Sequence, residues 1–343
     1  LYDTFRIKNP HEQLHLDFRL PFSKKHYKKQ LSKVRNYIHI GDTYQVNFTF
    51  RQRAKFHSDP YHLFQTIGQN ALFGAYLDLD DYAICSASPE LFFRVENGII
   101  ESRPMKGTIQ RGRTLKEDLF FKNQLQNSQK DRSENVMIVD MIRNDMGKIA
   151  ETGTVETPKL FEVEKHPTVW QMTSTVRAKT RASFSEILKA LYPCASITGA
   201  PKIRTMAIIR ELENSPRNIY CGTIGYLAPD GKMLFNVAIR TALINKKQKD
   251  LEYGIGGGIT WYSDSEKEFE EAILKSKIIR KKEVIPAFSL LETLLWTPEN
   301  GYFLLEKHLE RLADSARYFD FEVDLEEVKS ALVNGVTPPL KRW

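Results

Sequence analysis

Residues 220–260, "YCGTIGYLAPDGKMLFNVAIRTALINKKQKDLEYGIGGGIT", decide the fold class of this chain. Apolar runs alternate with turn residues at 229–231 and 246–250, which predicts a meander of three strands. The glycines at 256–258 close the last predicted strand, and a helical pattern over 265–282 follows it. This part of the chain is therefore a block of strands followed by a helix.

The remaining sequence extends the same arrangement of blocks. Apolar spacing predicts a helix over 23–40, and alternation predicts a strand over 43–56 with Tyr44, Val46, Phe48 and Phe50 on one face. Asn97-Gly98 predicts the turn of a hairpin. Further strands are expected within 74–88, and further helices over 116–146, from 184 and from Pro201. Because strands and helices do not alternate strictly, we expect an α+β protein.

Composition narrows the class of protein. The chain has 343 residues, 41% hydrophobic and 27% charged, which is typical of one large or two ordinary globular domains. Its net charge of +7 is modest and fits small anionic substrates, so no nucleic-acid partner is expected. No apolar run approaches the roughly 18 residues of a membrane span. Three scattered cysteines predict reduced thiols in the cytoplasm.

Two carboxylates precede the most apolar part of the helix expected over 116–146. Asp131 and Glu134 are three residues apart and share a helix face. Glu134 lies in line with Met137 and Met141, so its side chain is expected to be covered and to need a cation. An exposed acid in the first helical turn explains the pattern equally well.

A second acidic pair, Glu268 and Glu271, shares a helical stripe with Lys275. A solvated face is the simpler explanation, because this helix is rich in charge. Two carboxylate pairs on two helices nevertheless suit Mg²⁺, which takes oxygen ligands and bridges to anionic substrates.

Four further features point to an anionic ligand. The glycines 256–258 allow backbone N–H groups to approach an anion, although a tight strand end explains them too. "SITGAPKIRTM" (196–206) places a helix N-terminus after glycine and proline. Tyr226 and Arg240 are expected on neighbouring strands, and Lys106 at a glycine-kinked turn. Together they predict a pocket for a divalent cation and a compact polycarboxylate.

Seven motifs occur in the order and spacing of the chorismate-utilising enzymes, which the chain resembles over roughly residues 25–282. The resemblance implies a large α/β sandwich of two antiparallel sheets flanked by helices, of the anthranilate synthase component I type. It also implies a requirement for Mg²⁺, with Glu134 and Glu271 as ligands and Asp131 and Glu268 nearby. The motifs are "SPELFFR", "RPMKGT", "DRSENVMIVDMIRNDMG", "SITGAPKIRTM", "CGTIGY", "AIRT" and "GGGIT".

The resemblance also implies how chorismate is held. The metal would bind its ring carboxylate. Other substrate contacts are implied at Tyr226, Arg240, the backbone of Gly256, Gly257 and Gly258, and the side chains of Thr108, Thr198 and Lys275.

Three positions distinguish branches of this family. Gln45 stands where the water-activating lysine of isochorismate and salicylate synthases is found, so addition of water is disfavoured. Lys106 replaces the alanine of anthranilate synthases and resembles the lysine by which aminodeoxychorismate synthases attack chorismate at C2. Gln171 replaces a histidine associated with loss of pyruvate, and Glu90 resembles the acid that protonates the leaving C4 hydroxyl.

These residues favour the aminating component of aminodeoxychorismate synthase, which acts in 4-aminobenzoate and folate biosynthesis. No glutaminase triad is present, so ammonia is expected from a separate glutamine amidotransferase subunit. An anthranilate synthase component is the alternative, and a non-catalytic basic binding module is a remote one.

The last sixty residues resemble a different family. "FLLEKHLERL" (303–312) is similar to the opening of fold-type IV pyridoxal-phosphate (PLP) lyases and aminotransferases. We therefore expect a synthase domain over 1–282, lacking much of its N-terminal part, and a truncated lyase-like α+β segment over 283–343. No PLP-binding lysine is identifiable, so PLP is not expected within this stretch.

Overall fold

The computed structural model describes residues 14, 16–68, 71–277, 279 and 288–335. The chain divides into two compact units. The first comprises residues 1–107, 128–164 and 171–283, and the second comprises 108–127, 165–170 and 284–343. The predicted boundary between 282 and 283 falls among residues that the structure does not describe.

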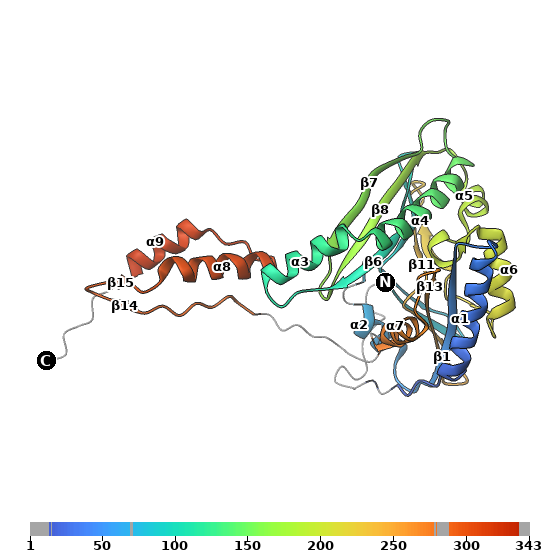
Figure 1. Cartoon of the computed structure of the whole chain (residues 1–343), viewed down its shortest axis with the longest axis horizontal. Coiled ribbons are helices and arrows are strands. Elements are labelled where there is room, and N and C mark those ends of the chain that lie inside the picture. Colours follow the sequence, from blue (N-terminus) through green and yellow to red (C-terminus); the bar gives the residue numbers. More distant parts are fainter. Residues whose placement is uncertain (1–13, 15, 69–70, 278, 280–287, 336–343) are drawn as a thin grey trace. The chain divides into compact units, whose positions relative to one another are not determined.

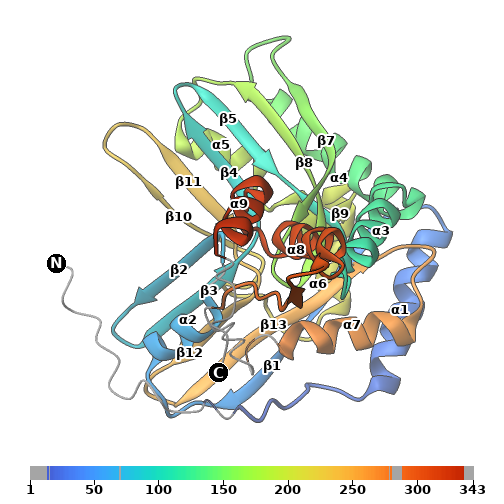
Figure 2. The ribbon, with the colours of Figure 1, turned by 90° about the vertical axis from the view of Figure 1, so that its left-hand side faces the viewer.

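A six-stranded sheet carries the glycine run (Figure 2). Its two longest strands are β1 (Gln45–Lys55) and β13 (Asp250–Ile259), which are neighbours, run antiparallel and place Asn47 opposite Gly258. The strand order is β2 (Phe73–Asp78), β3 (Tyr82–Ser88), β12 (Thr241–Asn245), β13, β1 and β9 (Gly199–Ala200).

A seven-stranded sheet forms the second layer. Its order is β10 (Thr223–Leu227), β11 (Met233–Val237), β4 (Leu91–Glu96), β5 (Ile99–Arg103), β8 (Val169–Lys179) and β6 (Met105–Gln110), with β7 (Glu156–Lys165) also paired to β8. The predicted α+β fold with two antiparallel sheets is confirmed.

The meander at 220–260 has four strands, so the expectation of three was wrong. The chain leaves the seven-stranded sheet after β11 and enters the other sheet at β12. Between them Arg240 adopts a φ of 50°. This left-handed conformation is unfavourable for a residue with a side chain and interrupts the extended backbone. Arg240 therefore lies on the connection and not on a strand.

The helix expected over 116–146 is two helices, α3 (Leu115–Gln126) and α4 (Gln129–Gly147). Ser128 has extended dihedral angles and accepts a hydrogen bond from Asp131 N, so it is an N-cap that starts a new helix. The other helices of the first unit are α1 (Lys24–His39), α2 (Pro60–Gly68), α5 (Phe184–Leu191), a 3₁₀ turn η1 (Ala195–Ile197), α6 (Lys202–Leu212) and α7 (Ser265–Lys277).

Buried apolar side chains fix α1 and α7 on the six-stranded sheet (Figure 1). Tyr27 of α1 packs its ring against Phe48 and Phe50 of β1 and against Phe269 of α7. Tyr44, expected on the apolar face of β1, instead precedes the strand and is 66% exposed. Because Phe269 faces this core, Glu268 and Glu271 lie on a different side of α7, which faces away from the core.

The second unit contains α3, a short hairpin of β14 (Trp296–Thr297) and β15 (Gly301–Tyr302), and the helices α8 (Leu305–Phe319) and α9 (Leu325–Gly335). Asp118 of α3 accepts hydrogen bonds from Arg111 and from Trp170 Nε1, while Tyr318 of α8 donates to Gly112 O at 2.7 Å. Within the described residues, no helix is long and apolar enough to cross a membrane.

Candidate active site

Lys106 lies on β6, so it is part of a strand and not of the expected turn. Gly107, which follows it, has a φ of 90°, a conformation that suits glycine and kinks the strand. Burial lowers the pKa of the Lys106 amine, and the charges of Glu134 and Glu90 oppose this effect. A lowered pKa increases the fraction of the amine that is neutral, which is the form that a nucleophile needs.

Glu90 lies between β3 and β4 and is 4% exposed. Burial raises its pKa to about 7, opposed by a hydrogen bond from the Ser196 hydroxyl and by the charge of Lys106. Its Oε1 has no hydrogen-bond partner among the described residues. A protonated, buried carboxyl with an unused oxygen is suited to donating a proton to a ligand.

The glycine run opens a face of β13 toward these groups. A Cβ built on Gly258 would stand 3.1 Å from Lys106 Nζ and 2.9 Å from Gln45 Nε2. A Cβ on Gly257 would stand 3.5 Å from Glu268 Oε2 and 3.6 Å from Lys275 Nζ. The glycines therefore leave space between two sets of polar side chains, as expected for a site in which backbone approaches a ligand.

Gly256 differs from these two glycines, because the space at its Cβ position is taken by the neighbouring strand β1. A Cβ on Gly256 would stand 2.3 Å from Phe48 O on β1, so a side chain would part the two strands. Its carbonyl accepts a hydrogen bond of 2.9 Å from Lys275 Nζ, which also pairs with Glu271 Oε1 at 2.9 Å.

The acidic residues of α4 and α7 influence one another's ionisation. Burial raises the pKa of Glu134, Lys106 opposes this, and Asp131 and Glu268 add to it. Burial likewise raises the pKa of Glu268, helped by the charge of Glu271. Burial also acts on Glu271, but the neighbouring Lys275 outweighs it and lowers the pKa. These carboxylates therefore lie close enough to repel one another.

This set of oxygen donors fits a hard divalent cation. Among the described residues, no three acidic, histidine or cysteine side chains converge tightly enough to form a complete cage. Mg²⁺ keeps water and substrate oxygens among its ligands, so a site for it does not require a complete cage of protein side chains. Asp131 is engaged by Ser128, whose hydroxyl donates to its carboxylate.

Three further predicted site residues, Arg240, Tyr226 and Gln171, lie in different surroundings. Burial lowers the pKa of Arg240, while Tyr253 and Glu90 raise it, so the guanidinium lies near the acid. Tyr226 lies on β10, is 57% exposed and pairs through its backbone with Leu234. Gln171 Nε2 donates to Gly107 O at 2.7 Å and so supports the kink beside Lys106.

Thr198 follows η1 and donates from its hydroxyl to Cys194 O at 3.0 Å. Thr108 lies on β6, two residues after Lys106. Ser196 was not predicted as a site residue, although its position within "SITGAP" (196–201) was a signal that could have identified it.

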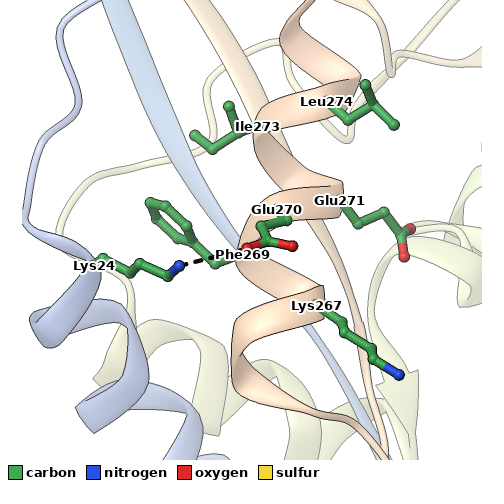
Figure 3. Close-up of a pocket in the computed structure, with 7 residues that line it drawn as sticks. All are labelled: Lys24, Lys267, Phe269, Glu270, Glu271, Ile273 and Leu274. Atoms are coloured by element: carbon green, nitrogen blue, oxygen red, sulfur yellow. Dashed lines mark ion pairs between the residues drawn. The ribbon is translucent and has the colours of Figure 1, made fainter.

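The described residues of the first unit line at least two hollows. One of about 550 Å³ adjoins the surface of α7, where Figure 3 shows Lys24 on one side of the helix and Glu271 on the other. Lys24 Nζ is 3.6 Å from Glu270 Oε1. The second, of about 580 Å³, includes Thr198, Glu213 and Arg217 in its lining.

Comparison with known proteins identifies relatives of the chain. The model of the family described as "chorismate binding enzyme" matches residues 4–281. Aminodeoxychorismate synthase component 1 of Salmonella typhimurium is 43% identical over 253 residues, which cover 73% of this chain and 55% of that protein. The protein of the same name from Klebsiella aerogenes is 40% identical over 271 residues, covering 78% and 60%. The chain thus spans little more than half the length of these relatives.

A solved structure of another protein has a similar fold. The crystal structure of anthranilate synthase component I from Streptococcus pneumoniae matches with a TM-score of 0.73 and 31% identity. The match covers 81% of this chain and 63% of that one.

Proposed function

The chain belongs to the family of chorismate-binding enzymes, and we propose that it aminates chorismate at C4 to give 4-amino-4-deoxychorismate. The observation that carries this proposal is the proximity of a buried lysine with a lowered pKa, Lys106, to a buried carboxyl with a raised pKa, Glu90. A neutral amine and a protonated acid are the two forms that the reaction requires. The names of the relatives point to the same reaction.

The chemistry proceeds by two displacements. The neutral Lys106 amine attacks the ring at C2, both ring double bonds shift by one position, the C4–O bond breaks, and the hydroxyl leaves as water with a proton from Glu90. Ammonia then adds at C4, both double bonds return to their original positions, and the Lys106 amine is released from C2. The ammonium group formed at C4 returns a proton to Glu90. The enolpyruvyl group is retained throughout.

Substrate carboxylates are assigned to the cationic and backbone groups of the site. We infer that Arg240, Tyr226, Thr108, Thr198, Lys275 and the backbone of 256–258 contribute these contacts. Gln45 occupies the position beside Lys106 and is 0% exposed, and an amide cannot act as a base toward water.

Mg²⁺ is assigned to Glu134 and Glu271, with Asp131 and Glu268 nearby. When bound, the ion would neutralise the repelling carboxylates and attract the ring carboxylate of chorismate. Glu134 and Glu271 would orient that carboxylate from α4 and α7.

Relatives named as a component 1 support a partner subunit. We propose that this partner is a glutamine amidotransferase that supplies ammonia, and that both proteins act in the cytoplasm. We propose that the C-terminal segment is lyase-like. Its Glu292 pairs with His308 Nδ1 and Arg311 Nε, both at 2.8 Å.

Incubation with chorismate, Mg²⁺ and ammonium at mildly alkaline pH tests the proposal. Chromatography and mass spectrometry should identify aminodeoxychorismate with its enolpyruvyl group intact. Anthranilate and pyruvate would instead support the alternative, to which the 31% identity with an anthranilate synthase component I points.

A further inference from the structure

A short segment behind the site, Cys194–Thr198, touches the proposed proton donor. Its Ser196 side chain lies close enough to the Glu90 carboxyl to lower the pKa of that group, against the effect of burial. The segment contains only the single 3₁₀ turn η1, so the internal hydrogen bonds of a long helix cannot hold it. Its position must therefore come from contacts with other elements.

Arg217 supplies one of these contacts. Its Nη1 donates to Ile197 O at 2.7 Å, and Asn47 Nδ2 donates to the same carbonyl at 3.1 Å. Asn47 N also donates to Thr198 O at 2.8 Å. Two consecutive carbonyls next to Ser196 are thus fixed by side-chain and backbone donors.

Glu213 fixes the guanidinium of Arg217. Its carboxylate accepts from Arg217 Nε at 3.1 Å and from Nη2 at 2.7 Å. The Arg217 Nη2 also donates to Asn47 O at 2.7 Å. The side chain of Glu213 is 3% exposed and that of Arg217 is 16% exposed, so the pair is shielded from water.

The same carboxylate is anchored on β1. It accepts from Thr49 N at 2.9 Å, from Thr49 Oγ1 at 2.8 Å and from Arg51 Nη2 at 3.0 Å. Arg51 already compensates the buried charge of Glu213. If Glu213 needed only a counter-charge, Arg51 would supply it without Arg217. Arg217 makes further hydrogen bonds, to Ile197 O and Asn47 O.

We propose that Arg217 is a positioning residue, which is held by Glu213 and fixes Cys194–Thr198 so that the Ser196 hydroxyl stays against Glu90. Arg217 acts through this segment and does not touch the reacting atoms. The catalytic consequence rests on the proposed function, whereas the positioning itself can be measured without any substrate.

Cys194 provides that measurement. It lies at the start of the segment and is 4% exposed, and burial raises the pKa of its thiol to about 12, so alkylation should be slow. In Arg217→Met we expect iodoacetamide labelling of Cys194 to rise several-fold, as measured by peptide mass spectrometry. Labelling of Cys85, which is 0% exposed on β3, should stay unchanged.

Two variants complete the comparison. Arg217→Lys keeps a cation beside Glu213 but has only one nitrogen, so it should give intermediate labelling. Arg210→Met is the matched control, because Arg210 is exposed and lines the same 580 Å³ hollow. It should label like the unmodified protein.

The turnover of chorismate supplies the second readout. In Arg217→Met we expect kcat to fall about 10- to 100-fold, since misplacing a proton donor slows the chemical step. KM should change less, and Arg217→Lys should restore part of kcat.

The outcomes separate the two proposals. Unchanged Cys194 labelling in Arg217→Met overturns the positioning role, and so does an equal rise at Cys194 and Cys85, which means general loosening. Selective labelling with an unchanged kcat overturns the link to Glu90. If the unmodified chain forms no aminodeoxychorismate, the proposed function fails, while selective labelling still supports the positioning role.

Discussion

Lys106 Nζ lies 3.1 Å from the point where a Cβ on Gly258 would stand. The two residues come from different sheets, β6 and β13. The absence of a side chain at Gly258 is therefore what leaves room for the Lys106 amine beside Gln45.

Replacement of Gly258 by alanine should impair the site more than the fold. The new methyl group would press on Lys106 Nζ and on the buried amide of Gln45, so we expect kcat/KM to fall about 100-fold, as for a small misplacement of a reacting group. Overpacking should cost about 1–3 kcal/mol of the free energy of unfolding. Gly147→Ala is the control, because no atom lies within 4 Å of its Cβ position. Unimpaired amination by Gly258→Ala would contradict the placement of Lys106.

Lys106→Ala should abolish amination at C4 and leave Mg²⁺-dependent binding of chorismate intact. The variant lacks the nucleophile but keeps the carboxylates of α4 and α7. Product chromatography with ammonium and calorimetry with chorismate measure the two properties. Amination by Lys106→Ala at the unmodified rate would rule out the covalent role.

Glu90→Gln should lose amination and gain stability at alkaline pH. The pKa of Glu90 is about 7 in the folded chain and about 4.5 when unfolded, so below pH 4.5 both states are protonated and its contribution vanishes. Between these pH values the unfolded state loses its proton before the folded state does. Above pH 7 the raised pKa of Glu90 lowers the free energy of unfolding by an amount of the order of 3 kcal/mol.

The amide removes that penalty, so thermal unfolding of Glu90→Gln should occur at higher temperature at pH 8 but not at pH 4.5. Glu96→Gln, at an exposed position of β4, should shift neither curve. A lower unfolding temperature for Glu90→Gln at pH 8 would show that Glu90 is stabilised as an ion.

Glu134→Ala should abolish Mg²⁺-dependent binding of chorismate, because it removes a proposed ligand of the ion. Removal of Mg²⁺ by a chelator should have the same effect on the unmodified chain. Calorimetry tests both, with Asp140→Ala as control because Asp140 lies on α4 with its side chain 64% exposed. Unchanged affinity in Glu134→Ala would exclude this residue as a ligand.

Asp118→Asn should destabilise the second unit. Asp118 accepts from Arg111 Nε at 2.6 Å, Gly112 N at 2.9 Å and Trp170 Nε1 at 2.9 Å, and its side chain is 2% exposed. The amide leaves Arg111 without its counter-charge, at an expected cost of about 3–5 kcal/mol. Faster hydrogen exchange in 108–127 and 165–170 would verify this, and Gln124→Ala, at an exposed position of α3, should leave exchange unchanged. Equal exchange in both variants would refute the role of Asp118.

Local sequence signals predicted most single elements. The apolar spacing of α1 and the Asn97-Gly98 turn between β4 and β5 were correct, because they depend on periodicity and turn geometry. The break at Ser128 was missed because the helical pattern continues on both sides of it, and only the N-cap conformation separates α3 from α4. The change of sheet at Arg240 was missed because the left-handed conformation of a non-glycine residue has no sequence signal.

The sequence by itself determined the α+β class, the glycine run and the motifs of the family, because each is a property of residues close together along the chain. The tertiary structure alone decided that Lys106, Glu90, Gln45 and Gly258 meet, and that Glu213 joins Arg217 to β1. It also decided the lowered pKa of Lys106 and the raised pKa of Glu90. These shifts arise from burial and from charges brought near by folding, which no local pattern contains.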